Sequence, residues 1–160
     1  MSRLAVDGGP PVRATLLPYG RQTVDEDDIQ VVLDVLRSDF LTTGPRVAAF
    51  ERAFERRTGA AHAVAVSNGT AALHAAVALL DLAPGDEVVT TPLTFAATAN
   101  AVLYAGGVPR FADVDPATLN LDPRAVEARL GPRTRAVIAV DYAGLPADLD
   151  ELRGICSRRG

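Results

Sequence analysis

The sequence contains no lysine, and all 16 of its basic residues are arginines. A reaction that needs a lysine amine, such as Schiff-base formation, therefore cannot be completed within these 160 residues. The single cysteine, Cys156, excludes an internal disulfide framework and a metal site built from several cysteines. Neither His62 nor His74 has a metal-ligand partner at a useful spacing, so we expect structural roles for both and no metal site.

Long apolar runs and an excess of positive charge are also absent. No segment reaches the roughly 18 apolar residues that span a membrane, and the first residues lack the basic-then-apolar order of a signal peptide. The net charge is −4 and the pI is near 5.1. Nucleic acids and anionic membranes both favour a basic face, so neither is expected as a partner. We expect a soluble, cytoplasmic protein.

The hydrophobic pattern predicts an N-terminal arm, residues 1–22, followed by one α/β region, residues 23–160. Thr23 and Glu26 fit a capping box that would begin a helix. A second helix would begin at Pro45, where proline is tolerated in the first turn, and end at Gly59.

From His62 onward, strand-like and helix-like segments alternate. Strands are predicted at 62–66, 87–90, 108–112 and 135–140, and helices at 71–82, 95–105, 122–130 and 148–159. This alternation predicts the α/β class, with a mostly parallel sheet covered by helices on both faces. The pattern stops after a helix, where another strand would be due, so we expect an interrupted domain.

The turn Ser67-Asn68-Gly69-Thr70 lies between a predicted strand and a helix. The start of a helix offers unpaired N–H groups and a partial positive charge, which suit a phosphate group. The same residue types also serve as ordinary helix caps. The glycine spacing is not that of a dinucleotide-binding fingerprint, and a P-loop would need a lysine.

Phe95 and Asp141 follow two further predicted strands. The carboxyl ends of the strands line the ligand crevice of an open α/β sheet, so both residues would lie near that crevice. Phe95 could stack on a planar ring or pack beneath a helix. The Asp141 carboxylate could bind a ligand or cap a turn. Cys156 has no nearby histidine in the sequence, so we do not expect it to be a nucleophile.

Several runs, in order and with unbroken spacing, resemble the N-terminal part of the DegT/DnrJ/EryC1/StrS family of pyridoxal-phosphate-dependent sugar aminotransferases. They include LTTGP at 41–45, SNGTAAL at 67–73, GDEV at 85–88, DVD at 113–115, RTRA at 133–136 and VDYAG at 140–144. The LPYGRQ run at 17–22 and the VDYAG run most resemble the UDP-4-amino-4,6-dideoxy-N-acetyl-β-L-altrosamine transaminase branch, on the pseudaminic acid route.

The resemblance implies the N-terminal part of a fold-type-I large domain, in a homodimer that binds pyridoxal 5′-phosphate (PLP). It also implies a nucleotide-linked keto-sugar substrate and glutamate as the usual amino donor. Four residues would bind the cofactor: Gly69 and Thr70 its phosphate, Phe95 its ring and Asp141, less directly, its edge. Three would lie toward the sugar nucleotide: Tyr19, Thr42 and Asn68.

Members of the family are more than twice as long as this chain. The resemblance places the aspartate that pairs with the pyridine nitrogen, and then the Schiff-base lysine, beyond residue 160. We therefore expect a fragment of such an enzyme that is inactive alone. Three alternatives stay open: a sugar dehydratase of the same family, a non-catalytic dimerisation or ligand-binding module, and a nicotinamide-dependent dehydrogenase, which the absent glycine fingerprint disfavours.

Overall fold

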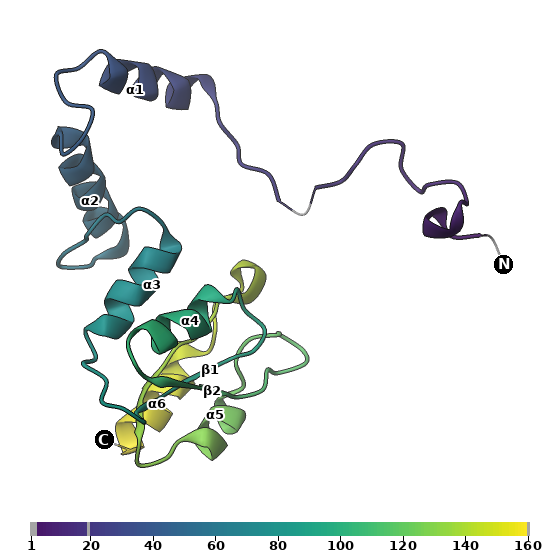
Figure 1. Cartoon of the computed structure of the whole chain (residues 1–160), viewed down its shortest axis with the longest axis vertical. Coiled ribbons are helices and arrows are strands. Elements are labelled where there is room, and N and C mark those ends of the chain that lie inside the picture. Colours follow the sequence, from purple (N-terminus) through teal and green to yellow (C-terminus); the bar gives the residue numbers. More distant parts are fainter. Residues whose placement is uncertain (1–2, 19, 160) are drawn as a thin grey trace. The chain divides into compact units, whose positions relative to one another are not determined.

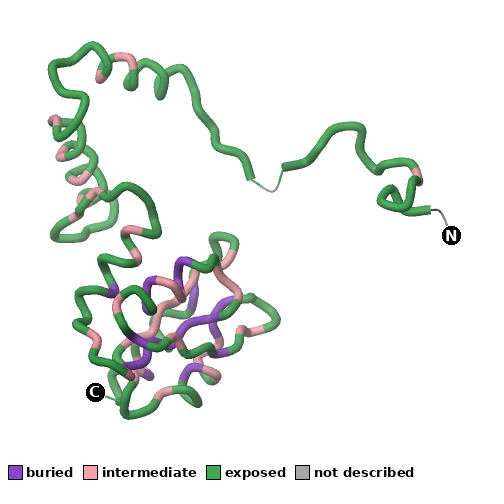
Figure 2. The backbone as a smooth tube through the Cα atoms, in the orientation of Figure 1, coloured by how far each residue is buried: buried purple, intermediate pink, exposed green. Residues whose placement is uncertain are grey.

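The structure is a computed structural model of the chain and describes residues 3–18 and 20–159 (Figure 1). It divides into two compact units, Met1–Ala63 and Val64–Gly160, which are described separately. Figure 2 shows that the buried residues belong to the second unit, and Val77 is the first buried residue along the described chain. Within the described residues, no helix has both the length and the apolar character needed to cross a membrane.

The first unit contains a 3₁₀ turn, Ala5–Asp7, and the helices α1 (Glu26–Leu36) and α2 (Pro45–Thr58). The helix α1 is capped by Asp25 instead of Thr23, so the predicted capping box was wrong by two residues. The Asp28 N–H donates to the Asp25 carboxylate at 3.0 Å, and the Asp25 N–H donates to the Asp28 carboxylate at 3.1 Å. An aspartate pair at this spacing satisfies both donors, which favours the later start.

The predicted start and end of α2 are confirmed. Pro45 occupies its first position, and Gly59 ends it in the left-handed conformation with φ 76°. The Gly59 N–H donates to the Glu55 carbonyl at 2.8 Å, which satisfies one of the last carbonyls of the helix.

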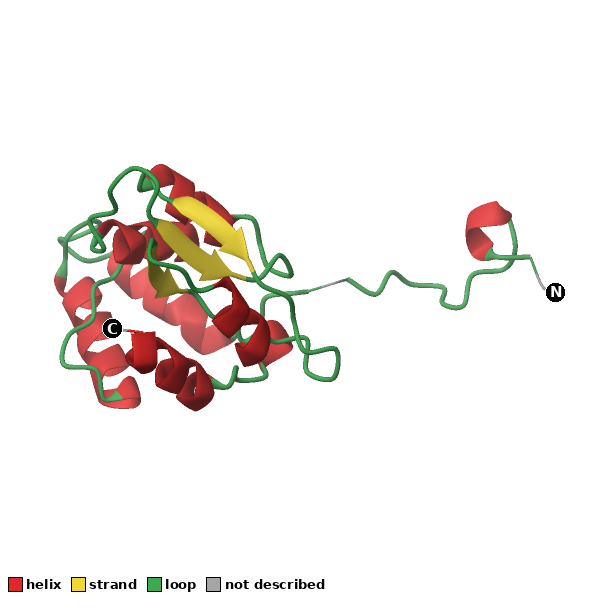
Figure 3. Cartoon of the chain, turned by 90° about the horizontal axis from the view of Figure 1, so that it is seen from below, coloured by secondary structure: helices red, strands yellow, loops and turns green. Residues whose placement is uncertain are grey.

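The second unit is built around a parallel sheet of three strands, β1 (Glu87–Thr90), β2 (Val108–Phe111) and β3 (Thr134–Val137), in the order β2-β1-β3. Figure 3 shows the arrows lying side by side and pointing the same way. Its helices are α3 (Gly69–Ala78), α4 (Ala97–Tyr104), α5 (Pro123–Arg129) and α6 (Leu149–Arg159), with a 3₁₀ turn at Tyr142–Gly144. The predicted α/β class is confirmed.

The central strand β1 is buried on both faces. Val88 packs with Val77 of α3 and with Val102 of α4. Val89 points to the other face, where it joins a cluster that includes residues of α5 and α6. Successive strand residues alternate between faces, so the two valines fill two separate cores. Gly107 leads into β2, and a Cβ there would lie 2.5 Å from Leu82 Cδ1, so the close packing at this position requires glycine.

The strand predicted at 62–66 was wrong. These residues form no strand, and the side chains of Val64 and Val66 are 81% and 44% exposed. Both edges of β1 are already occupied by β2 and β3. Within the described residues the 62–66 segment pairs with no strand, and a strand needs a hydrogen-bonded neighbour to form.

Candidate functional site

Asn68 starts helix α3 and acts as its cap. Its backbone is extended, and its Oδ1 accepts a hydrogen bond from the Ala71 N–H at 2.9 Å. The capping interpretation of this turn is thereby confirmed for Asn68. The N–H groups of Gly69 and Thr70, the first two of the helix, find no acceptor within the described residues and are exposed.

The start of α3 is open enough to receive an anion. No atom lies within 4 Å of the position that a Cβ of Gly69 would occupy. The two exposed N–H groups, the Thr70 hydroxyl and the positive end of the helix dipole all favour negative charge there. The residues present therefore fit a phosphate group.

The loop after β1 presents Phe95 to solvent. Its side chain is 78% exposed, so it does not pack beneath a helix in this structure. Two buried threonines, Thr91 and Thr98, and the half-buried Thr94 shape the loop around it. The Thr91 hydroxyl accepts from the Leu93 N–H at 3.0 Å, and the hydroxyls of Thr94 and Thr98 lie 2.9 Å apart. An exposed ring on a loop ordered in this way is suited to contact a planar ligand.

Asp141 begins the loop that follows β3. Its Oδ1 accepts a hydrogen bond from the Ala147 N–H at 2.9 Å, so one carboxylate oxygen closes the loop on itself. Within the loop, Ala143 adopts the left-handed conformation with φ 53°. This conformation is costly for a residue with a Cβ and persists where the surroundings impose it.

The fold brings these three features to one side of the second unit. The strands are parallel, so the loops after β1 and β3 emerge at the same edge, and the Thr90 hydroxyl donates to the Ile138 carbonyl at 3.0 Å between them. In Figure 1, α3 runs in the opposite direction to β1, so its first turn lies toward the side to which β1 points. The parallel strands thus place Phe95 and Asp141 at the carboxyl edge of the sheet, and Gly69 and Thr70 begin the helix that packs with α4 through Val77.

Two further residues predicted to face a substrate lie outside the described part of the second unit. Tyr19 lies outside the described residues. Thr42 belongs to the first unit, in the turn between α1 and α2, where it lines a pocket of about 310 Å³. Their proposed roles stay predictions.

Sequence reasoning missed Asn120, a polar residue that is only 5% exposed. It lies between β2 and α5, and its side chain bonds to the backbone of residues 142, 145 and 146. The only signal in the sequence is an amide between two leucines, which gives no indication of partners more than twenty residues away.

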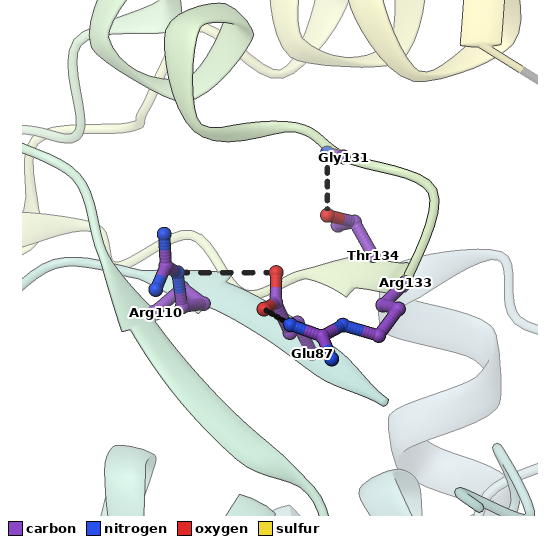
Figure 4. Close-up of polar contacts among 5 residues, drawn as sticks. All are labelled: Glu87, Arg110, Gly131, Arg133 and Thr134. Carbon is purple, nitrogen blue, oxygen red and sulfur yellow. Dashed lines mark hydrogen bonds and ion pairs between the residues drawn. The ribbon is translucent and has the colours of Figure 1, made fainter. Parts of the chain in front are cut away.

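The opposite, amino edge of the sheet carries charged pairs. Glu87, whose side chain is 11% exposed, lies 3.4 Å from Arg133 and 3.8 Å from Arg110 (Figure 4). Asp86 accepts from the Ala83 N–H at 3.0 Å and pairs with Arg135 at 3.0 Å. The Ala83 hydrogen bond lowers the pKa of the Asp86 carboxyl; burial opposes this shift and Arg135 adds to it. The carboxylates at the amino edge are therefore paired with arginines in or directly before strands of the same sheet.

The second unit is an α/β domain with an uncovered helix start at Gly69 and an exposed ring at Phe95. The sequence profile of the DegT/DnrJ/EryC1/StrS aminotransferase family matches residues 22–160. The chain belongs to this aminotransferase family.

The relatives support the same assignment. The spore coat polysaccharide biosynthesis protein SpsC of Bacillus subtilis is 43% identical over 148 residues, which cover 92% of this chain and 38% of SpsC. Helicobacter pylori PseC, an aminotransferase of pseudoaminic acid biosynthesis, is 34% identical with a TM-score of 0.80, covering 88% of this chain and 38% of PseC.

A third relative, Spr1654 of Streptococcus pneumoniae, has been solved in forms with PLP and with pyridoxamine phosphate (PMP). It is 29% identical with a TM-score of 0.84, covering 89% of this chain and 36% of Spr1654. Pyridoxal phosphate is thus a cofactor found in this family. The chain spans little more than a third of the length of each of these relatives.

Proposed function

We propose that this chain forms the phosphate-binding and ring-binding part of a PLP-dependent aminotransferase that acts on a nucleotide-linked 4-keto-6-deoxy sugar. The observation that carries the proposal is the first turn of α3. Gly69 and Thr70 are exposed there, and Phe95 presents an exposed ring on the loop after β1. Phosphate and pyridine ring are the two features of PLP that a protein must hold.

Each residue has a defined task in this proposal. The N–H groups of Gly69 and Thr70 and the Thr70 hydroxyl would donate to the phosphate oxygens. Phe95 would cover one face of the pyridine ring, which orients it and excludes water from that face. Asp141 would face the edge of the cofactor. When bound, PLP supplies the electron sink for the reaction, and the protein supplies orientation and electrostatics.

The substrate side of the proposal rests on the family. We place the chain in the altrosamine transaminase branch, with Tyr19, Thr42 and Asn68 toward the sugar nucleotide and glutamate as amino donor. PseC, an aminotransferase of pseudoaminic acid biosynthesis, is among the relatives that the chain matches, at 34% identity. We further propose a cytoplasmic homodimer.

The 160 residues should not catalyse transamination by themselves. The reaction needs a lysine amine, and this sequence has none. One other candidate is a non-catalytic module that binds the cofactor phosphate or associates with a full-length relative, a role that needs no lysine. Residues 1–160 fit a sugar dehydratase of the same family as well as they fit an aminotransferase.

A titration of the ¹⁵N-labelled chain, followed by NMR, tests the proposal. The probe is PMP, because it carries the phosphate and the ring but lacks the aldehyde that would react with the N-terminal amine. We expect the amide signals of Gly69 and Thr70 to shift with PMP and with inorganic phosphate. Signals around Phe95 should shift with PMP alone. Shifts confined to other regions, or no shift at either set, would refute the proposed site.

A further inference from the structure

Asn120 is a buried amide whose hydrogen bonds all go to one loop. Its Nδ2 donates to the Leu145 carbonyl at 3.0 Å and to the Pro146 carbonyl at 3.1 Å. Its Oδ1 accepts from the Tyr142 N–H at 2.9 Å. With the side chain only 5% exposed, these bonds are shielded from water, so breaking any of them leaves a buried polar group unpaired.

The loop that Asn120 holds begins with Asp141 and closes at Ala147. Residues 141 and 143–146 are exposed, whereas Ala147 is buried. Ala143 sits in the left-handed conformation and is followed by Gly144 at φ 83°. A water-exposed loop would relax away from the costly Ala143 conformation unless other contacts imposed it. Two backbone bonds close the turn, from the Gly144 N–H to the Asp141 carbonyl and from the Leu145 N–H to the Tyr142 carbonyl. The Asn120 amide and the Asp141–Ala147 bond hold this turn from outside it.

Asn120 itself is anchored independently of the loop. It follows Leu119, and its own carbonyl accepts from the Asp115 N–H at 2.9 Å. Its neighbour Leu121 is 1% exposed and belongs to the core cluster beneath the sheet. The turn between β2 and α5 is therefore a fixed support, from which the amide reaches across to the loop after β3.

We propose that Asn120 is a positioning residue that holds the loop of residues 141–147 in a preformed shape, with Asp141 toward the ligand at the carboxyl edge of the sheet. This inference rests on the proposed function for the identity of the ligand. The shape of the loop, in contrast, is a property of the chain alone and can be measured without any ligand.

The first measurement is amide hydrogen exchange in the 160-residue chain, read at three amides. Tyr142 reports the Asn120 bond, Ala147 reports the Asp141 bond, and Ile138, bonded to Val89 at 2.8 Å, reports the sheet. Asn120→Leu keeps similar volume and removes all three hydrogen bonds. We expect exchange at Tyr142 and Ala147 to rise at least tenfold relative to Ile138.

Leu121→Ala is the matched control, because it weakens the neighbouring core without touching the amide. It should speed exchange at all three sites alike. If Asn120→Leu also raises the exchange rates of the three amides by the same factor, Asn120 is an ordinary core residue and the inference is wrong. Should Asn120→Leu fail to fold, Asn120→Asp keeps the acceptor for Tyr142 and loses both donated bonds, and the same comparison applies.

The second measurement connects the loop to the ligand. In the native chain, PMP should shift the amides of residues 141–147 as well as those of Gly69 and Thr70. In Asn120→Leu, the shifts at 141–147 should fall at least threefold while those at Gly69 and Thr70 persist. Unchanged shifts at 141–147 would overturn the positioning role. A native chain in which PMP shifts Gly69 and Thr70 alone leaves the proposed phosphate site intact and refutes this inference.

A native chain that shows no shift at Gly69 and Thr70 contradicts the proposed function, and with it the ligand-facing part of this inference. The exchange rates still decide whether Asn120 fixes the loop. The two failures are therefore distinguishable.

Discussion

The two edges of the parallel sheet are built from different chemistry. At the amino edge, the acids Asp86 and Glu87 are buried and paired with arginines and backbone donors. On the side toward which β1 points, the Gly69 and Thr70 N–H groups have no acceptor within the described residues, Phe95 is exposed, and Ala143 is held in a costly conformation. The carboxylates at the amino edge are satisfied internally, whereas the two N–H groups and the ring are left available. We infer that the amino edge stabilises the fold and the carboxyl edge binds the ligand.

The largest expected effect is on stability at the amino edge. Glu87→Ala leaves Arg110 and Arg133 without their shared partner. It should lower the free energy of unfolding by about 2–3 kcal/mol, less than for a fully buried pair because both arginines are partly exposed. Urea unfolding measures this change, and PMP binding should be unaffected.

The surface pair Arg158–Glu127, at 3.2 Å, provides the control for that experiment. Glu127→Ala should change the unfolding free energy by less than about 0.5 kcal/mol. If Glu87→Ala and Glu127→Ala lower the free energy of unfolding by the same amount, the buried pairs of the amino edge stabilise the fold no more than a surface pair does.

The next effect is on binding at the carboxyl edge. Phe95→Ala should weaken PMP binding by about 1–3 kcal/mol, or roughly 5-fold to 150-fold in Kd, through the lost stacking and burial. The free energy of unfolding of Phe95→Ala should be nearly that of the native chain, because the Phe95 ring is exposed in the free chain. Phe95→Tyr keeps the ring and should keep most of the affinity. An unaltered Kd in Phe95→Ala would show that the ring does not stack on the ligand.

A smaller effect is expected at the start of α3. Thr70→Val removes one hydroxyl donor and should raise the Kd for PMP several-fold, about 1 kcal/mol for one charge-assisted hydrogen bond. Thr70→Ser retains the hydroxyl and should bind like the native chain. Equal affinities in all three proteins would place the phosphate elsewhere.

The smallest effect is a pH dependence at the amino edge. The pKa of Asp86 is lowered in the folded state, so this carboxylate stabilises the fold above its unfolded pKa of about 4. That contribution is lost as the pH falls through the lower, folded-state pKa. Unfolding curves should therefore show stability falling below about pH 4, with a shallower fall in Asp86→Asn. If the native chain and Asp86→Asn lose stability equally as the pH falls, Asp86 does not contribute to the pH dependence of folding.

The sequence predicted elements that depend on local pattern. Short apolar segments that follow glycine or proline turns located the three observed strands. Each helix of the second unit was found within a few residues of its bounds. The prediction of a strand at 62–66 was wrong because a strand forms only beside a hydrogen-bonded partner strand, which a local pattern cannot reveal. The predicted cap of α1 was wrong because two residues that can cap a helix, Thr23 and Asp25, lie two positions apart.

The site was predictable where it depends on sequence order. Phe95 was proposed from the rule that ligands bind beyond the carboxyl ends of strands, and the turn at 67–70 from the unpaired N–H groups at the start of a helix. Asn120 was not predictable, because its partners are 22 to 26 residues away and lie in an irregular loop. The left-handed Ala143 was equally hidden, because nothing in an alanine signals a positive φ.

The strand order β2-β1-β3 has a consequence for synthesis of the chain. The first strand to be made becomes the central one, and both of its neighbours come later in the sequence. On the ribosome, β1 has no partner until Phe111 has emerged, and its other edge stays open until Val137 follows. The β1–α4–β2 segment, with its shorter sequence separation, should therefore fold first, and the closing of the last edge should set the pace of sheet formation.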